Sequence, residues 1–146
     1  MDYKITDNKA DMDVDAIHNY LTCSYWAKNV PKSVITKAIE NSLCFGVFAI
    51  TANENGQQVG FARLITDSVT FAYLADVYIL EEHRGKGLSK QLMATIVKHP
   101  QLQGLRRIML ATRDAHGLYE KYGFTALTDQ TMFMQLWTPD VYSQTP

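Results

Sequence analysis

Residues 77–89 read Val77-Tyr78-Ile79-Leu80-Glu81-Glu82-His83-Arg84-Gly85-Lys86-Gly87-Leu88-Ser89, and this stretch decides the fold. A β-rich run over residues 69–80 ends here, and the apolar spacing from Leu88 onward predicts a helix. Gly85 and Gly87 allow a tight turn that leaves several backbone N–H groups unpaired at the helix start. Those groups and the helix dipole suit a diphosphate, and Arg84 and Lys86 add positive charge beside it.

A glycine turn before a helix is a weak signal by itself, because such motifs often mark only a turn. A phosphate-binding P-loop would need a Lys-Ser/Thr pair after the glycines, and a dinucleotide fold would need a third glycine near Lys90. The sequence has neither. An ordinary turn, or a regulator that binds ATP at this turn, stays open as an alternative.

The 146 residues carry a formal net charge of -1 and predict one domain spanning residues 1–146. This balance argues against nucleic-acid or anionic-membrane partners. The N-terminus lacks a signal core and the chain has no run of about 18 apolar residues, so we expect a cytoplasmic protein. Cys23 and Cys44 make no disulfide framework and no zinc spacing, so we expect no metal and two buried or neutral thiols.

Apolar periodicity and turn residues predict alternating strands and helices. Helices are expected from Asp13 as N-cap to Leu21, from Pro31 onward, from Leu88 to His99-Pro100, and from Asp114 to Tyr122. Expected strands cover residues 3–6, 44–52, 59–66, 69–80, 107–112, 124–127 and 132–137. Residues 53–57 read as a hairpin turn with Gly56 available for a positive φ.

The glycine turn resembles the acetyl-CoA signature of the GNAT superfamily, Arg/Gln-x-x-Gly-x-Gly/Ala, with Arg84, Gly87 and Ser89 at its named positions. Ser89 departs from the usual Gly or Ala. The resemblance implies a mixed α/β fold: a mostly antiparallel twisted sheet of six to seven strands, splayed between the fourth and fifth, with about four helices. It also implies acetyl-CoA as co-substrate. Main-chain groups of Val77, Tyr78 and Ile79 would hold the pantetheine arm, and the diphosphate would lie on Arg84, Gly85, Lys86, Gly87, Leu88 and Ser89.

A second stretch, residues 118–124, resembles the family signature in which a helix tyrosine precedes a Gly-Phe step. The resemblance places Tyr119 near the coenzyme sulfur, where a phenol can protonate the leaving thiolate. Many family members carry an Asn ahead of this helix, and residues 111–115 have none. The alternative reading of Tyr119 is a half-buried core residue.

An amine acceptor must lose a proton before it attacks a thioester, so a base is required. Asp76 is the first candidate, because strand alternation puts it on one face with Leu74 and Tyr78, where a carboxylate is costly unless it is paired or functional. A structural Asp bonded to neighbouring backbone is the equal alternative. Tyr25 and Trp26 are candidate acceptor contacts through cation–π interactions, or else a hydrophobic staple between two helices.

These expectations combine into an N-acetyltransferase that moves an acetyl group from acetyl-CoA to a primary amine of a small molecule or peptide, by direct attack in a ternary complex. The alternative is a non-catalytic acyl-CoA sensor or interaction module on the same fold. A monomer or homodimer fits either reading. Residues 137–142 could border the cleft, form a dimer seam, or cap the last strand.

Overall fold

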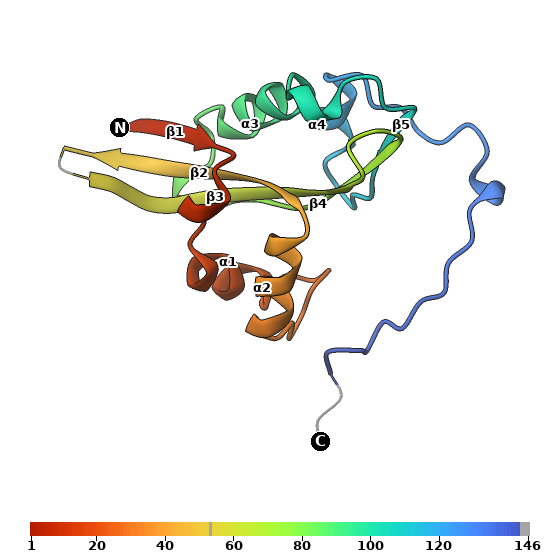
Figure 1. The fold of residues 1–146 in the computed structure, drawn as a ribbon, viewed down its shortest axis with the longest axis horizontal. Helices are drawn as coiled ribbons and strands as arrows, with labels where there is room; N and C mark the ends of the chain where they lie inside the picture. The colour runs from red at the N-terminus through yellow and green to blue at the C-terminus, as the bar shows by residue number, and fades with distance from the viewer. Residues whose placement is uncertain (53, 144–146) are drawn as a thin grey trace.

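The computed structural model describes residues 1–52 and 54–143, which form one five-stranded sheet with helices on both faces (Figure 1). The strands are β1 (Asp2–Thr6), β2 (Leu43–Thr51), β3 (Glu54–Thr66), β4 (Phe71–Ile79) and β5 (Arg107–Leu110). The helices are α1 (Val14–Leu21), α2 (Lys32–Glu40), α3 (Leu88–Val97) and α4 (His116–Glu120). Short 3-10 turns lie at Lys9–Asp11, Glu81–His83, Pro100–Leu102 and Gln130–Met132.

The strands lie in the order β1-β2-β3-β4-β5, antiparallel up to β4, while β4 and β5 run parallel. The parallel pairing spans only four positions and ends where Leu74 faces Leu110. Beyond that pair β4 continues for five more residues without β5 beside it. The two strands therefore diverge, as the resemblance implied.

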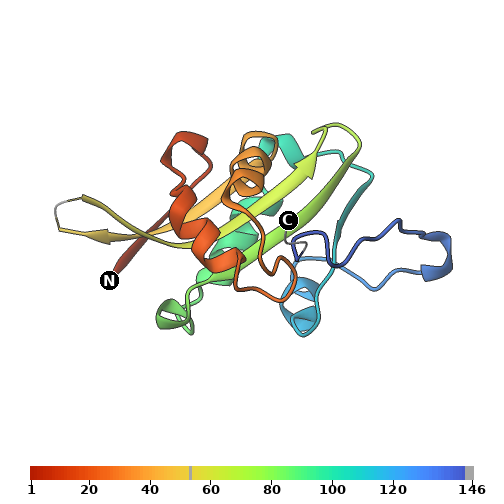
Figure 2. The ribbon, with the colours of Figure 1, turned by 90° about the horizontal axis from the view of Figure 1, so that it is seen from below.

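Two hydrophobic cores cover the two faces of the sheet. One contains Phe45, Leu64, Leu92 and Ile96, and it lies under α3 and α4. The other contains Ile17, Ile35 and Phe61, and it lies under α1 and α2. Figures 1 and 2 show this layering, with α1 and α2 on one side of the sheet and α3 and α4 on the other.

Local signals placed the first two helices correctly. The Asp13 carboxylate accepts a hydrogen bond from the Ala16 amide at 3.1 Å and caps α1. Pro31 directly precedes α2. The hairpin turn is shorter than predicted, because β3 begins at Glu54 and already includes Gly56. A Cβ on Gly56 would collide with the Ala49 carbonyl, so glycine here permits close approach of two strands.

The prediction of six to seven strands is wrong, because the sheet has five. Residues 124–127 and 133–137 form no strand. Phe124 still contacts the core through the Tyr119 ring, with centroids 5.9 Å apart. Beyond Leu127 every described residue is exposed; in Figure 1 this segment leaves the sheet and then turns back toward the side of α1 and α2, where Tyr142 lines the cleft described below. Both segments are rich in apolar residues, but a strand also needs a neighbouring strand to pair with.

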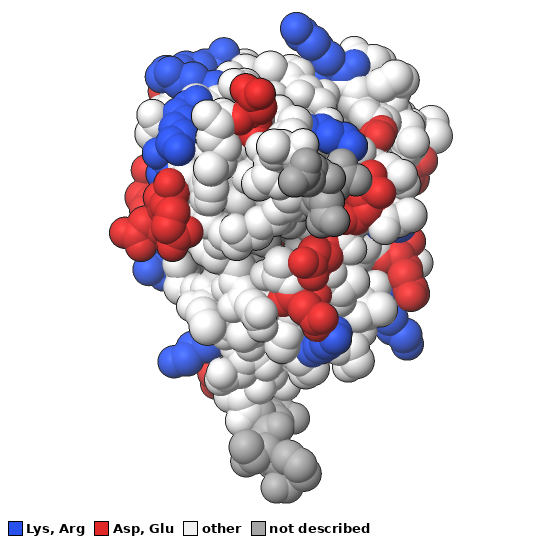
Figure 3. All heavy atoms as spheres, turned by 90° about the vertical axis from the view of Figure 1, so that its left-hand side faces the viewer, with Lys and Arg blue, Asp and Glu red and all other residues white. Residues whose placement is uncertain are grey.

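Acidic and basic side chains are interspersed over the face shown in Figure 3, in keeping with the near-neutral net charge. No helix in the described part of the chain has the length and apolar character needed to cross a bilayer.

Candidate active site

A cleft of about 1150 Å³ lies between the loop that follows α1, helix α2, strand β4 and the connection from β5 to α4. It brings together most of the residues singled out from the sequence. Those that line it are Tyr25, Trp26, Asp76, Val77, Tyr78, Ile79, Arg84, Ser89 and Tyr119. Gly85, Lys86, Gly87 and Leu88 lie outside its wall, in the turn that leads from β4 to α3.

The second half of β4 offers one unpaired edge to this cleft. On its other side Tyr78 and Ile79 pair with Phe61 and Gly60 of β3. An extended ligand can therefore bind Val77 and Tyr78 like an added strand. The Ile79 carbonyl is already engaged, because it accepts a hydrogen bond from Arg84 Nε at 2.9 Å.

Strand β4 changes phase at Asp76, which has a φ of 58° in the left-handed region. Leu74 packs in the core under α3, whereas Tyr78 packs in the core under α1 and α2. The expectation that Leu74, Asp76 and Tyr78 share one face is therefore wrong. The cause is a bulge, visible as a register shift against Phe61 and Arg63 of β3, which breaks the period of two.

The Asp76 carboxylate is paired on both oxygens. Arg63 Nε lies 2.5 Å from Oδ2, and the Trp26 indole N–H donates to Oδ1 at 2.8 Å. The side chains of Arg63 and Asp76 are only 18% and 7% exposed. The partners of the Asp76 carboxylate are thus side chains from β3 and from the loop after α1. The alternative expected from the sequence, hydrogen bonds to neighbouring backbone, is not what the structure shows. Arg63 was missed, although a lone charge between Ala62 and Leu64 was a readable signal.

The turn after β4 leaves the start of α3 open and uncapped. Gly85 and Gly87 both have a φ of 77°, and a Cβ on either would meet nothing within 4 Å. The space before α3 is therefore open, and no side chain caps the helix. Leu88 is buried in the core, so only its backbone can face an anion. These features fit the phosphate groups of a coenzyme.

The two cations of this turn are held by tyrosines. The Arg84 guanidinium donates to the Tyr20 hydroxyl at 3.2 Å. The Lys86 ammonium donates to the Tyr3 hydroxyl at 3.2 Å and lies 5.8 Å from the centre of that ring. Both charges are thus positioned near the start of α3 by contacts from α1 and β1. Neither tyrosine contact was foreseen, because both partners are more than 60 positions away in the sequence.

Tyr119 lies at the wall of the cleft and is 8% exposed. Burial raises the pKa of its phenol, and the neighbouring Tyr25 and Asp114 raise this pKa further. The phenol is therefore protonated at neutral pH and can donate a proton to an anion in the cleft. The alternative role of Tyr119, that of a half-buried core residue, also has support, because its ring packs within the core beside α3.

Tyr25 and Trp26 link the loop after α1 to both walls of the cleft. The Arg113 guanidinium lies 3.8 Å from the centre of the Tyr25 ring, which joins this loop to the connection between β5 and α4. Trp26 binds Asp76 of β4, and its ring packs 5.1 Å from that of Tyr25. Below them the Tyr20 and Tyr78 rings stack 3.9 Å apart. An aromatic wall therefore surrounds the paired carboxylate.

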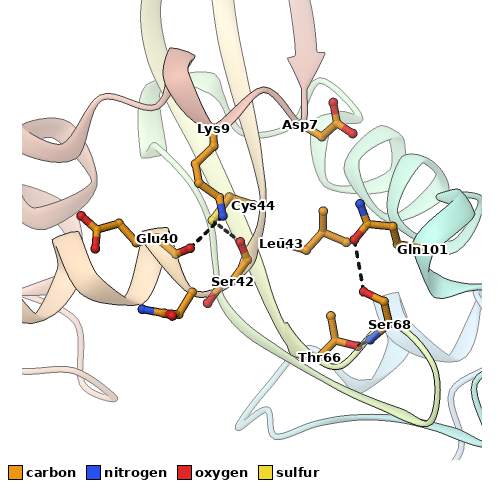
Figure 4. A pocket seen from close by; sticks show the side chains of 10 residues that line it. Asp7, Lys9, Glu40, Ser42, Leu43, Cys44, Thr66, Ser68 and Gln101 are labelled. Atoms are coloured by element: carbon orange, nitrogen blue, oxygen red, sulfur yellow. Dashed lines mark hydrogen bonds between the residues drawn. The ribbon is translucent and has the colours of Figure 1, made fainter.

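A smaller polar cavity of about 370 Å³ lies between the end of α2 and the first residues after β1 (Figure 4). Lys9 donates to the Glu40 carbonyl across it, and Ser68 bonds to Gln101. Cys44 borders this cavity, and burial raises the pKa of its thiol to about 11. Cys23, expected to be buried or neutral, is exposed. No cluster of three or more metal-ligating side chains occurs among the described residues.

An uncapped helix start after β4, with a tyrosine at the wall of the neighbouring cleft, is typical of an acetyltransferase fold. The family model described as Acetyltransferase (GNAT) family matches residues 14–124, and the chain belongs to this family.

Relatives agree with this assignment. A crystal structure of a candidate GNAT acetyltransferase from Xanthomonas campestris is 46% identical, with a TM-score of 0.92 over 99% of both chains. A candidate acetyltransferase of Gibberella zeae is 38% identical, over 82% of this chain and 77% of that protein. A Clostridium acetobutylicum structure with acetyl-CoA is 18% identical, covers 92% of this chain and 94% of that chain with a TM-score of 0.64, and shares the fold.

Proposed function

We propose that the protein is an N-acetyltransferase that moves an acetyl group from acetyl-CoA to a primary amine of a small molecule or peptide. One observation carries the proposal. A single cleft joins an unpaired β4 edge, the approach to an uncapped α3 and the protonated phenol of Tyr119. Each of these suits a different part of an acyl-CoA: the amide-containing arm, the diphosphate and the sulfur.

Backbone groups would make most of the donor contacts. Val77 and Tyr78 would bind the pantetheine amides as an added strand. The N–H groups from Gly85 to Ser89 would hold the diphosphate at the α3 N-terminus, with Lys86 beside them. Arg84 and the Ile79 carbonyl are bonded to each other, so they would chiefly fix the shape of the turn.

Asp76 and Tyr119 would divide the proton transfers. Asp76 would accept the proton of the attacking ammonium, because each carboxylate oxygen keeps a second lone pair beside its bond to Arg63 or Trp26. Tyr119 would give its proton to the thiolate as the carbon–sulfur bond breaks, and the second proton of the attacking nitrogen would leave afterwards and restore the phenol through water. The cleft exceeds the usual 300–1,000 Å³ of a ligand pocket, so both substrates could bind together for direct attack.

Tyr25 and Trp26 would contact the acceptor. Both residues are more than one third exposed; Arg113 covers one face of the Tyr25 ring, and Asp76 fixes Trp26 through its indole N–H. An aromatic wall near a carboxylate favours a cationic amine. The acceptor would therefore bind as an ammonium and lose its proton within the cleft.

The test incubates the purified chain with acetyl-CoA and a panel of polyamines, amino acids, aminoglycosides and peptides. Release of free CoA thiol and acetylation of the amine by mass spectrometry are measured together. Matched formation of both products supports the proposal. CoA uptake by calorimetry without turnover on any amine would favour the alternative, a non-catalytic acyl-CoA sensor. Absence of CoA uptake by folded protein would reject both.

A further inference from the structure

The cleft carries one cation to which the proposed acetyl transfer assigns no role. Arg113 is exposed in the cleft wall, in the connection between β5 and α4. Its guanidinium lies 3.8 Å from the centre of the Tyr25 ring. No carboxylate among the residues that the structure describes forms an ion pair with Arg113. Its charge is therefore available to a ligand in the cleft.

The contact with Tyr25 presents the Arg113 guanidinium in a form that suits a carboxylate. A guanidinium stacked on an aromatic ring keeps its N–H groups in its own plane, where they can still donate. Two of these groups match the two oxygens of a carboxylate, and such paired, charge-assisted hydrogen bonds are among the strongest in proteins. The Tyr25 ring packs in turn against the Trp26 ring, 5.1 Å away. The donors are thus held in place before a ligand binds.

Arg113 also lies close to the groups proposed to transfer protons. Tyr25, on which it stacks, is near enough to Tyr119 to raise the pKa of that phenol. Trp26, the next ring along the wall, donates to the Asp76 carboxylate at 2.8 Å. The aromatic wall therefore has the proposed base at one end and Arg113 at the other. A small molecule bound between them can present an amine to Asp76 and an anion to Arg113.

The charges that line the cleft favour an acceptor with both signs of charge. They are three arginines, Arg63, Arg84 and Arg113, and two carboxylates, Asp76 and Asp114. Arg63 is paired with Asp76, and Arg84 lies at the turn before α3. A polyamine or an aminoglycoside, with several ammonium groups, would need more carboxylates than these. One ammonium and one carboxylate fit the charges present.

We propose that the acceptor is a free amino acid, with its carboxylate bound by Arg113 and its ammonium facing Asp76. This inference rests on the proposed acetyl transfer and names the class of its acceptor. An apolar side chain of the amino acid would pack on Tyr25 and Trp26, which are 55% and 42% exposed. Arg113 stays protonated throughout and takes no part in the proton transfers. It binds and orients the acceptor.

Paired acceptors, with and without the carboxylate, test the role of Arg113. The pairs are phenylalanine with 2-phenylethylamine, leucine with 3-methylbutylamine, and 4-aminobutanoate with propylamine. In the native chain we expect kcat/KM to be at least about tenfold higher for the amino acid of at least one pair, the usual effect of a hydrogen bond between charged groups. In Arg113→Met, which keeps a long side chain on Tyr25, the advantage should fall below about threefold, because the carboxylate has lost its partner.

Two further variants separate this effect from folding. Arg113→Gln is the second variant in case the first does not fold, and it should lose the same preference. Arg106→Met changes an exposed arginine outside the cleft and should keep the full preference. Circular dichroism and CoA affinity should be unchanged in all three variants.

Binding of the product gives a readout that needs no turnover. Calorimetry with the product N-acetylphenylalanine in the presence of CoA should give a Kd at least about tenfold weaker in Arg113→Met than in the native chain. Turnover of amines with no advantage for any amino acid would reject this acceptor and leave the acetyl transfer standing. An advantage that survives both Arg113 variants, or equal product affinity in native chain and variants, would also overturn the proposal. Absence of turnover with product affinity that depends on Arg113 would reject the transferase and support the carboxylate site.

Discussion

The hydroxyl of Tyr119 can be removed with little change in packing, and its removal tests the proposed protonation of the thiolate. Tyr119→Phe keeps the ring that packs against Phe124 and removes only the proton donor. We expect kcat to fall by about 10²–10⁴-fold, the usual contribution of a general acid, with KM for acetyl-CoA changed less than about threefold. Steady-state thiol release measures both. Unchanged turnover would reject the role.

The pH profile checks the same residue independently. Burial raises the Tyr119 pKa above its ordinary value of about 10. The acid form is therefore present at every pH below that value, and it is lost only above it. Activity of the native chain should rise with pH as the amine deprotonates and stay high through pH 9. A fall in kcat beginning near pH 7 would show that a different group is the acid.

Asp76 should be sensitive to both charge and backbone shape. Asp76→Gly removes the partner of the buried Arg63 and should lower the free energy of unfolding by about 2–4 kcal/mol. Asp76→Ala removes the same pair but keeps a Cβ at a φ of 58°, so it should be about 1–2 kcal/mol less stable than Asp76→Gly, in which glycine relieves this strain. Urea denaturation of both variants gives the difference. Equal stability of the two would show that the bulge relaxes when the pair is lost.

The position of a residue in the fold was easiest to predict where a motif lies within a few positions of sequence. Arg84, Gly87 and Tyr119 occupy the places that their signatures implied, in the turn before α3 and in α4. Arg63 and Tyr20 were missed, because their roles arise from pairing with Asp76 and Arg84 in other elements. Such contacts depend on how distant elements pack and on strand register, and neither can be predicted from a local sequence motif.

At the scale of elements, a substitution in the turn between β4 and α3 has two effects that can be measured separately: backbone strain and loss of CoA binding. Gly87→Ala places a Cβ in the open space before α3, and we expect CoA binding to weaken at least about tenfold because phosphate oxygens can no longer approach the backbone. The backbone strain should lower stability by about 1–2 kcal/mol. Isothermal calorimetry and thermal unfolding measure the two effects.

Gly104→Ala is the matched control for this turn. Gly104 has nearly the same φ of 76°, and a Cβ there also meets nothing within 4 Å, but the residue does not line the cleft. It should lose similar stability and keep full CoA affinity. A similar loss of affinity in both variants would assign the effect to folding and remove the argument for a phosphate site.

Helices were easier to predict than strands for a physical reason. The N-cap at Asp13 and the proline before α2 act within one turn of the chain. The face of β4 was predicted wrongly because the bulge at Asp76 depends on its partner strand. Residues 132–137 were predicted as a strand but pair with no strand among the residues that the structure describes, so pattern and structure disagree there.

For the molecule as a whole, the coenzyme should act as a stabiliser. A ligand that binds only the folded state at 100 times its Kd adds about 2.7 kcal/mol, so saturating CoA should raise Tm by several degrees. The gain should be smaller in Gly87→Ala at the same CoA concentration. Differential scanning fluorimetry measures both. A larger shift with ATP than with CoA would favour a nucleotide-binding regulator.

The mostly antiparallel sheet was predicted from the family resemblance, and the order of elements agrees with it, because short connections leave few ways to arrange four strands before a crossover helix. The divergence of β4 from β5 came only from the family resemblance. The number of strands could not be predicted from the sequence, because it depends on whether the C-terminal segment pairs with the edge of a sheet.

The phase change in β4 has a consequence for molecular evolution. Upstream of Asp76 the strand's alternate side chains belong to the core under α3, and downstream Tyr78 belongs to the opposite core. A one-residue deletion at the bulge would restore strict alternation and keep Tyr78 beside Tyr20, but it would remove the carboxylate that binds Arg63 and Trp26. Descendants of this chain should therefore tolerate length changes in the β2–β3 hairpin far better than in β4.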